Sequence, residues 1–118
     1  MSEMTFPERH AHLRDLTAQL AREAPGPMSG FARLHASAVT DGALPPKVKE
    51  LMALAIAIAI HCDGCIAYHV HDALYAGATR EEIVETIAVA VMMGGGPAAV
   101  YGAEALEATD QFAAARSA

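Results

Sequence analysis

Helix start and stop signals recur along this chain and constrain its fold more than any other feature. Thr5-Phe6-Pro7-Glu8 and Thr79-Arg80-Glu81-Glu82 match a capping box, in which a Thr hydroxyl and a Glu carboxylate satisfy the first backbone amides of a helix. Breaks are indicated at Pro25-Gly26-Pro27, Thr40-Asp41-Gly42 and Gly94-Gly95-Gly96. Apolar residues recur at helical spacing between these signals, so an all-α fold is predicted.

The helices are predicted over residues 6–23, 28–39, 48–60, 63–76, 79–93 and from 97 to about 113, with Gly77 as a C-terminal cap. The Ala-Ile alternation before residue 60 also fits a buried strand, but Leu, Met and Ala favour a helix packed on nearly all sides. No repeat, charge block or linker interrupts the chain. Residues 1–118 are therefore expected to form one domain, a compact bundle of about six helices with antiparallel neighbours.

The amino-acid composition limits the classes of function that the chain can have. The chain has 118 residues, 53% of them apolar, with no Trp, three Phe and three Tyr, so small aliphatic side chains must build the core. A net charge of -6 and few aromatic rings argue against nucleic-acid binding. The longest apolar run, Leu51 to Ile60, is about half of the roughly 20 residues that cross a bilayer. With no secretion signal at the start, we expect a cytoplasmic protein without membrane contact.

The residues that indicate chemistry are Cys62, Cys65 and His69. On a helix they fall within a stripe about 60° wide, so their side chains can meet. A thiol in the first turn of a helix, near a His, is favoured as the reactive thiolate, whereas Asp63 opposes that form. A second thiol can then condense with a sulfenic acid formed on the first and close a disulfide.

Other interpretations of the cysteines stay open. In one of them, the two cysteines are only small apolar side chains in an Ala-rich core. A zinc site is another, but Cys62, Cys65 and His69 would need a further ligand such as His61, Glu50 or a second subunit, and no metal is expected. Covalent haem attachment is excluded because Ile66 stands where that motif needs His.

These residues also carry a family resemblance. Glu50, Cys62, Cys65 and His69 reproduce the E-x11-C-x2-C-x3-H pattern of the alkylhydroperoxidase D-like proteins in the carboxymuconolactone decarboxylase superfamily. The resemblance spans roughly residues 44–108. It includes the Leu-Pro-Pro-Lys-Val-Lys-Glu stretch, the Tyr68-His69 pair, the turn at 76–83, and the stretch ending in Gly-Gly-Gly-Pro.

The resemblance implies a thiol-dependent peroxidase of all-α fold, assembled as a homotrimer or homohexamer. It makes Cys65 the thiol that attacks a hydroperoxide, Cys62 the resolving thiol, and Glu50 with His69 the proton relay. It implies no bound cofactor but an external dithiol reductant, in the best-known relatives a lipoylated protein. Some hydroperoxidase members carry His directly before the second Cys, where this chain has Gly64. That departure puts the relay and the hydroperoxide substrate in question.

Spacing alone does not bring Glu50 to the thiols. Twelve residues of unbroken helix would separate Glu50 from Cys62 by about 18 Å, so the chain must fold back near His61 or a second subunit must close the site. Glu50 could instead pair with Lys47 or face solvent. The other histidines are expected to be surface, contact or core residues outside the site: His10, His12, His35, His61 and His71.

Two further functions compete with peroxide reduction. One is decarboxylation of a muconolactone-type acid, the reaction of the superfamily's founding members, which do not rely on a CxxC pair. The other is a non-enzymatic, redox-sensing oligomer whose disulfide state changes its assembly. The high apolar content suggests apolar helix faces covered by other subunits, and this is compatible with all three functions.

Overall fold

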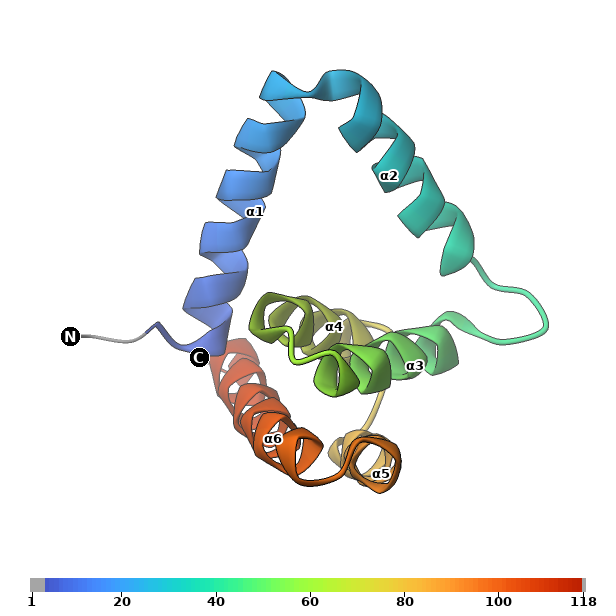
Figure 1. The fold of residues 1–118 in the computed structure, drawn as a ribbon, viewed down its shortest axis with the longest axis vertical. Coiled ribbons are helices and arrows are strands. Elements are labelled where there is room, and N and C mark those ends of the chain that lie inside the picture. The colour runs from blue at the N-terminus through green and yellow to red at the C-terminus, as the bar shows by residue number, and fades with distance from the viewer. Residues whose placement is uncertain (1–3, 118) are drawn as a thin grey trace.

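Six α-helices make up residues 4–117, the part of the chain that the computed structural model describes (Figure 1). They are α1 (Phe6–Glu23), α2 (Pro25–Ala38), α3 (Pro46–Ala59), α4 (Asp63–Tyr75), α5 (Arg80–Gly94) and α6 (Gly96–Ser117). The all-α prediction and the number of helices are confirmed. In the described part of the chain, no helix combines the length and hydropathy needed to cross a membrane.

Both predicted capping boxes are present. Thr5 accepts a hydrogen bond from the Glu8 amide at 3.2 Å, and the Glu8 carboxylate accepts one from the Thr5 amide at 2.8 Å. Thr79 and Glu82 make the same reciprocal pair at the start of α5. Each box satisfies amides that the first turn of a helix leaves unpaired, so the sequence motif fixes where the helix begins.

Two boundaries differ from the prediction by three residues or more. α2 begins at Pro25, three residues before the predicted start, and only Ala24 separates it from α1. α1 ends at Glu23 as predicted, but the prolines lie within the first turn of α2, because a proline there loses no hydrogen bond and its fixed φ suits the helix. α6 continues to Ser117 instead of ending near Ala113, since its Ala-rich end holds no residue that breaks a helix.

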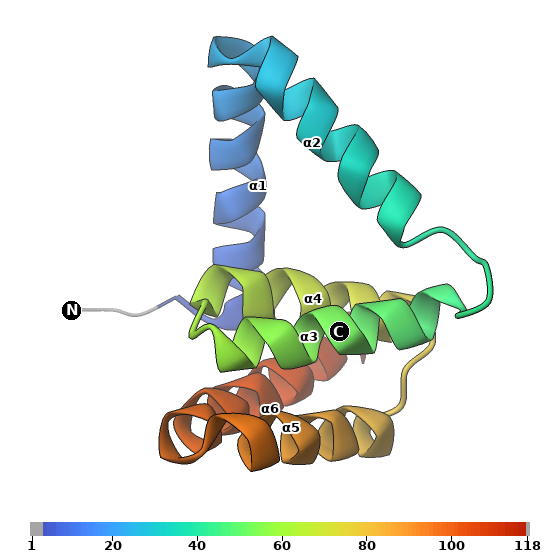
Figure 2. The same cartoon turned by 45° about the vertical axis from the view of Figure 1, so that its right-hand side comes forward.

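Helices α3 to α6 form two stacked layers, with α3 and α4 in one and α5 and α6 in the other (Figure 2). α3 packs on α5 and α4 packs on α6. The largest fully buried apolar side chains come from α3, α4 and α5: Leu54, Ile58, Ile66, Val70 and Ile83. The core therefore lies directly beneath the α3–α4 pair and fixes how these two helices meet.

α1 and α2 form a V-shaped arm on this bundle (Figures 1 and 2). The start of α1 is anchored to α6, where the Phe6 amide donates to Gln111 Oε1 at 2.7 Å and Phe6 and Phe112 are both buried. α1 also packs on α4, whereas among the helices α2 contacts α1 alone. The end of α2 returns toward α3 and α4.

Candidate functional site

The two cysteines lie where α4 begins. Cys62 is the N-cap residue of this helix, and its sulfur accepts a hydrogen bond from the Cys65 amide at 3.2 Å. A disulfide joins Cys62 to Cys65, with their Cα atoms 5.2 Å apart. The prediction that these side chains can meet is confirmed. A bond between residues three apart closes a very short loop and therefore stabilises little of the fold.

A sharp turn places Glu50 next to His69. His61 has a φ of 62°, in the left-handed region, and the Cys62 amide donates to the Ala57 carbonyl at 3.1 Å, so the chain reverses between α3 and α4. Glu50 on α3 therefore faces His69 on α4, with Oε1 2.8 Å from Nδ1. The fold-back near His61 that the sequence required is present within one chain.

Glu50 is buried, with 6% of its surface exposed, and His69 is its hydrogen-bond partner. Lys47, the alternative partner weighed from the sequence, binds Glu82 on α5 at 2.9 Å instead. A buried carboxylate is costly unless it is paired, and the imidazole supplies that partner. The pair can hold a proton on either side chain and pass it to a group in the site.

α4 carries Cys65, His69 and Asp72 on one face. Cys65 and His69 lie one helical turn apart, the spacing at which helical side chains are neighbours, and Asp72 follows three residues after His69 on the same face. The thiols thus sit at the start of α4, where the helix dipole favours a thiolate, and the Glu50–His69 pair sits one turn further along.

Gly64, the departure from some hydroperoxidase relatives, is explained by α1. A Cβ atom at position 64 would lie 2.9 Å from Leu13 Cδ1, so any larger residue has to displace that side chain. Further along the same two helices, α1 also contacts α4 through Thr17 and Tyr68, whose hydroxyl oxygens lie 3.4 Å apart. α1 therefore occupies the space that a side chain at position 64 would fill.

Two residues near the site were missed by the sequence analysis, His35 and Asp72. The rings of His35 and His69 lie 6.2 Å apart between centroids, although His35 is on the arm. One ligand atom each of His35, Glu50 and Asp72 lies within 4.8 Å of the others. Asp72 had a local signal in its spacing from His69. His35 had none, because only the return of α2 toward α4 brings it there.

Of the other histidines, His71 contacts this group, with its Nδ1 2.9 Å from Asp72 Oδ1, and the rest make packing contacts elsewhere or are exposed. His10 is buried and stacks on His71 with ring centroids 4.3 Å apart, beside Tyr68 and Phe112. His61 stacks on Tyr101 at 4.7 Å. His12 is exposed. These contacts make His10, His61 and His71 packing residues.

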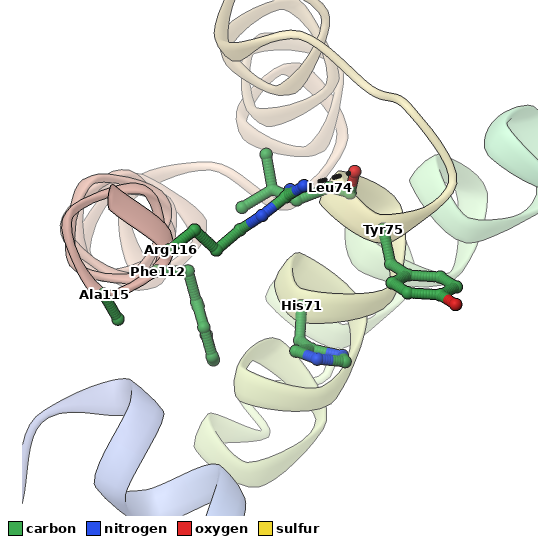
Figure 3. A pocket seen from close by; sticks show the side chains of 6 residues that line it. All are labelled: His71, Leu74, Tyr75, Phe112, Ala115 and Arg116. Atoms are coloured by element: carbon green, nitrogen blue, oxygen red, sulfur yellow. Dashed lines mark hydrogen bonds between the residues drawn. The ribbon is translucent and has the colours of Figure 1, made fainter. Parts of the chain in front are cut away.

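A pocket of about 390 Å³ lies between α4 and α6, on the face of α4 away from the cysteines (Figure 3). It is lined by His71, Leu74, Tyr75, Phe112, Ala115 and Arg116. Arg116 donates to the Leu74 carbonyl at 3.4 Å. None of the four predicted site residues lines this pocket, so we do not assign the redox chemistry to it.

The fold and the site together define a class of protein, an all-α bundle with a CxxC pair at the start of one helix and a Glu–His pair between two helices. The sequence pattern of the carboxymuconolactone decarboxylase family matches residues 25–108. The chain belongs to the carboxymuconolactone decarboxylase family.

The chain is also similar to solved structures and to a curated relative. The apo structure of a carboxymuconolactone decarboxylase family protein from Legionella pneumophila superposes with a TM-score of 0.88 at 45% identity, covering 91% of this chain and 96% of that one. A Thermotoga maritima protein superposes with a TM-score of 0.82 at 27% identity, covering 88% and 91%. An uncharacterized protein of Cupriavidus necator is 44% identical over 87 residues, 74% of this chain and 77% of its own.

Proposed function

We propose that this protein is a thiol-dependent peroxidase that reduces an organic hydroperoxide and cycles its CxxC pair between dithiol and disulfide. The observation that carries the proposal is the Cys62–Cys65 pair at the start of α4, one turn from the Glu50–His69 pair. The bonded sulfurs are the oxidised end of such a cycle. Family membership supports an enzyme in general, although the family's name refers to a decarboxylation and not to peroxide reduction.

Cys65 is the attacking thiol in this proposal. It lies in the first turn of α4, where the helix dipole favours its thiolate, and the Glu50–His69 pair accepts its proton. The thiolate attacks the outer oxygen of the hydroperoxide and the O–O bond breaks. The alkoxide takes the proton back from the relay and leaves as an alcohol, and Cys65 becomes a sulfenic acid.

Cys62 resolves this intermediate. Its sulfur attacks the Cys65 sulfur, the S–O bond breaks, and the hydroxyl leaves as water with the Cys62 proton. Two thiols have then become one disulfide, and one hydroperoxide has become one alcohol and one water. An external dithiol, such as a lipoylated protein, restores the thiols by exchange through a mixed disulfide. The cycle needs no bound cofactor.

The test follows thiols, mass and peroxide together. We expect reduced protein mixed with one equivalent of cumene hydroperoxide to lose both thiols and about 2 Da while the peroxide disappears. Cys65→Ser should remove the reaction. Cys62→Ser should form a sulfenic acid that dimedone traps, and should not turn over. His12→Ala is the control, since His12 is an exposed histidine on α1 outside this group, and it should react like the unaltered protein.

Intact thiols beside persisting peroxide would overturn the proposal. Cysteine-independent release of CO₂ from a muconolactone-type acid would then assign the decarboxylase activity that gives the family its name. A change in sedimentation between reduced and oxidised protein, without turnover, would assign the redox-sensing function instead.

A further inference from the structure

We propose that His35, Glu50 and Asp72 form a binding site for a divalent transition-metal cation of the Zn²⁺ type, separate from the cysteines. The three side chains come from three different helices, α2, α3 and α4, and one ligand atom of each lies within 4.8 Å of the others. The site does not rest on the proposed peroxidase function.

The donor set fits this class of cation. One imidazole nitrogen and two carboxylate oxygens suit Zn²⁺ and Mn²⁺ better than the all-oxygen shells that Ca²⁺ and Mg²⁺ prefer. Ligand atoms around a tetrahedral Zn²⁺ lie roughly 3.3 Å apart, so modest side-chain rotations close the present spacing. His35 is exposed and free to make such a rotation. Three protein ligands leave a fourth position open for water or a substrate.

Each carboxylate already has an imidazole that orients it. Glu50 Oε1 lies 2.8 Å from His69 Nδ1, and Asp72 Oδ1 lies 2.9 Å from His71 Nδ1. Among residues 4–117, the hydrogen bonds of these two carboxylates involve only these oxygens, so the second oxygen of each is open to a cation. Ligating side chains in metal sites are typically held in this way by outer hydrogen bonds, which fix the direction of the remaining lone pairs.

Charge supports the same assignment. Two carboxylates approach each other closely here, and among residues 4–117 neither one pairs with a lysine or an arginine. Glu50 is also buried, with 6% of its surface exposed. Like charges at short range are unfavourable unless a cation lies between them, and a divalent ion bound to His35 supplies that charge.

The cation would also tie the arm to the bundle. Among the helices α2 contacts α1 alone, and His35 is the residue through which it reaches the Glu50–His69 pair. A ligand from α2 beside ligands from α3 and α4 therefore restrains the end of α2. Cation binding should slow hydrogen exchange there, which gives a readout independent of any enzymatic activity.

The test uses untagged, full-length protein in its disulfide form, because reduced thiols would bind Zn²⁺ themselves. Calorimetric titration with ZnCl₂ should give one site per chain. His35→Ala and Asp72→Asn should each bind at least ~10-fold more weakly, since removal of even an outer-shell partner costs that much. His12→Ala, an exposed histidine elsewhere on the arm, is the matched control and should bind like the unaltered protein.

Hydrogen exchange completes the test. We expect ZnCl₂ to protect the amides near residues 31–38 in the unaltered protein and in His12→Ala, but not in His35→Ala. Equal Zn²⁺ affinity in His35→Ala and the unaltered protein would overturn the site. So would absence of binding, because the two carboxylates would then be balanced by imidazoles alone. Since no peroxide is used, failure of this test is distinguishable from failure of the proposed peroxidase.

Discussion

At the scale of single residues, the Glu50 carboxylate has the most constrained surroundings of any group in the site. It is buried on α3, and its hydrogen bond to His69 crosses to α4. A buried acid with one imidazole partner can exchange a proton over a short, fixed distance, so the pair is suited to a relay.

Replacement of Glu50 by Gln tests that role. Glu50→Gln preserves the shape of the side chain and a hydrogen bond to His69, but it cannot take up a proton. We expect the protein to fold normally and the rate of thiol oxidation by cumene hydroperoxide to fall by about 10²-fold or more. The measurement is the rate of thiol loss by stopped flow as a function of pH.

Glu85→Gln is the control for this change, because it removes the same charge from an exposed position on α5. It should leave the rate of thiol loss unchanged. If Glu50→Gln oxidises as fast as Glu85→Gln at every pH, Glu50 is a structural partner of His69 and takes no part in proton transfer.

At the scale of elements, glycines decide how closely two helices approach. A Cβ atom at Gly102, buried on α6, would lie 2.6 Å from Ile87 Cγ2 on α5. Gly30, within α2, has no atom within 4 Å of the same position. The two glycines therefore differ in packing although both lie within helices.

We expect opposite effects on the free energy of unfolding when Gly102 and Gly30 are each replaced by Ala. Gly102→Ala should lower the free energy of unfolding by about 1–3 kcal/mol, because α5 and α6 must separate to admit the methyl group. Gly30→Ala should raise it by about 0.5–1 kcal/mol, because Ala restricts the unfolded chain and favours the helix. Urea denaturation measures both. A stabilising Gly102→Ala would mean that the contact between α5 and α6 adjusts at no cost.

The stability of the contact between α1 and the bundle is expected to depend on pH. His10 packs against His71, Tyr68 and Phe112, and burial is the main cause that lowers its pKa below the ordinary value of 6.5. His71 and Arg14 lower this pKa further, while Asp72 acts in the opposite direction. The folded protein therefore takes up a proton at His10 less readily than the unfolded chain does.

Stability should fall as the pH falls through the ordinary His value, since the unfolded state then binds more protons. We expect the free energy of unfolding to decrease between about pH 7.5 and about pH 5.5 in the presence of EDTA. His10→Phe keeps an aromatic ring in the cluster without a titratable group, so the decrease should be smaller. An equal decrease in both proteins would show that His10 is not its source.

At the scale of the whole molecule, large apolar side chains of α3 and α5 remain exposed to solvent. Met52 and Ile56 on α3 and Ile60 at its C-cap follow one another at four-residue spacing and are 51%, 59% and 63% exposed. On α5, Met92 and Met93 are 72% and 77% exposed. An apolar surface of this kind typically marks a contact between protein chains.

We propose that further copies of the chain cover these side chains, in the homotrimer or homohexamer that the family resemblance implies. Met93→Glu should shift the sedimentation coefficient toward that of a smaller species, because a charge cannot be buried unpaired at the interface. Ala103→Glu adds the same charge at an exposed position of α6 and should leave sedimentation unchanged. If neither variant changes sedimentation, the α5 methionines lie outside any interface.

The sequence by itself determined the local features of this protein. Capping boxes at Thr5 and Thr79 placed two helix starts, and the spacing of Cys62, Cys65 and His69 placed them together at α4. These inferences succeed because helix caps and turn-to-turn neighbours depend on residues only three or four apart. The start of α2 was misjudged because Pro25 suits a first turn as well as it suits a break.

Only the tertiary structure decided which side chains from different helices meet. The reversal at His61 selected His69 over Lys47 as the partner of Glu50, and the packing of Leu13 over Gly64 explained a departure from relatives. The return of α2 brought His35 to Asp72, which no local pattern indicates. Such contacts depend on how helices pack over the core, and that packing is set jointly by residues far apart in the chain.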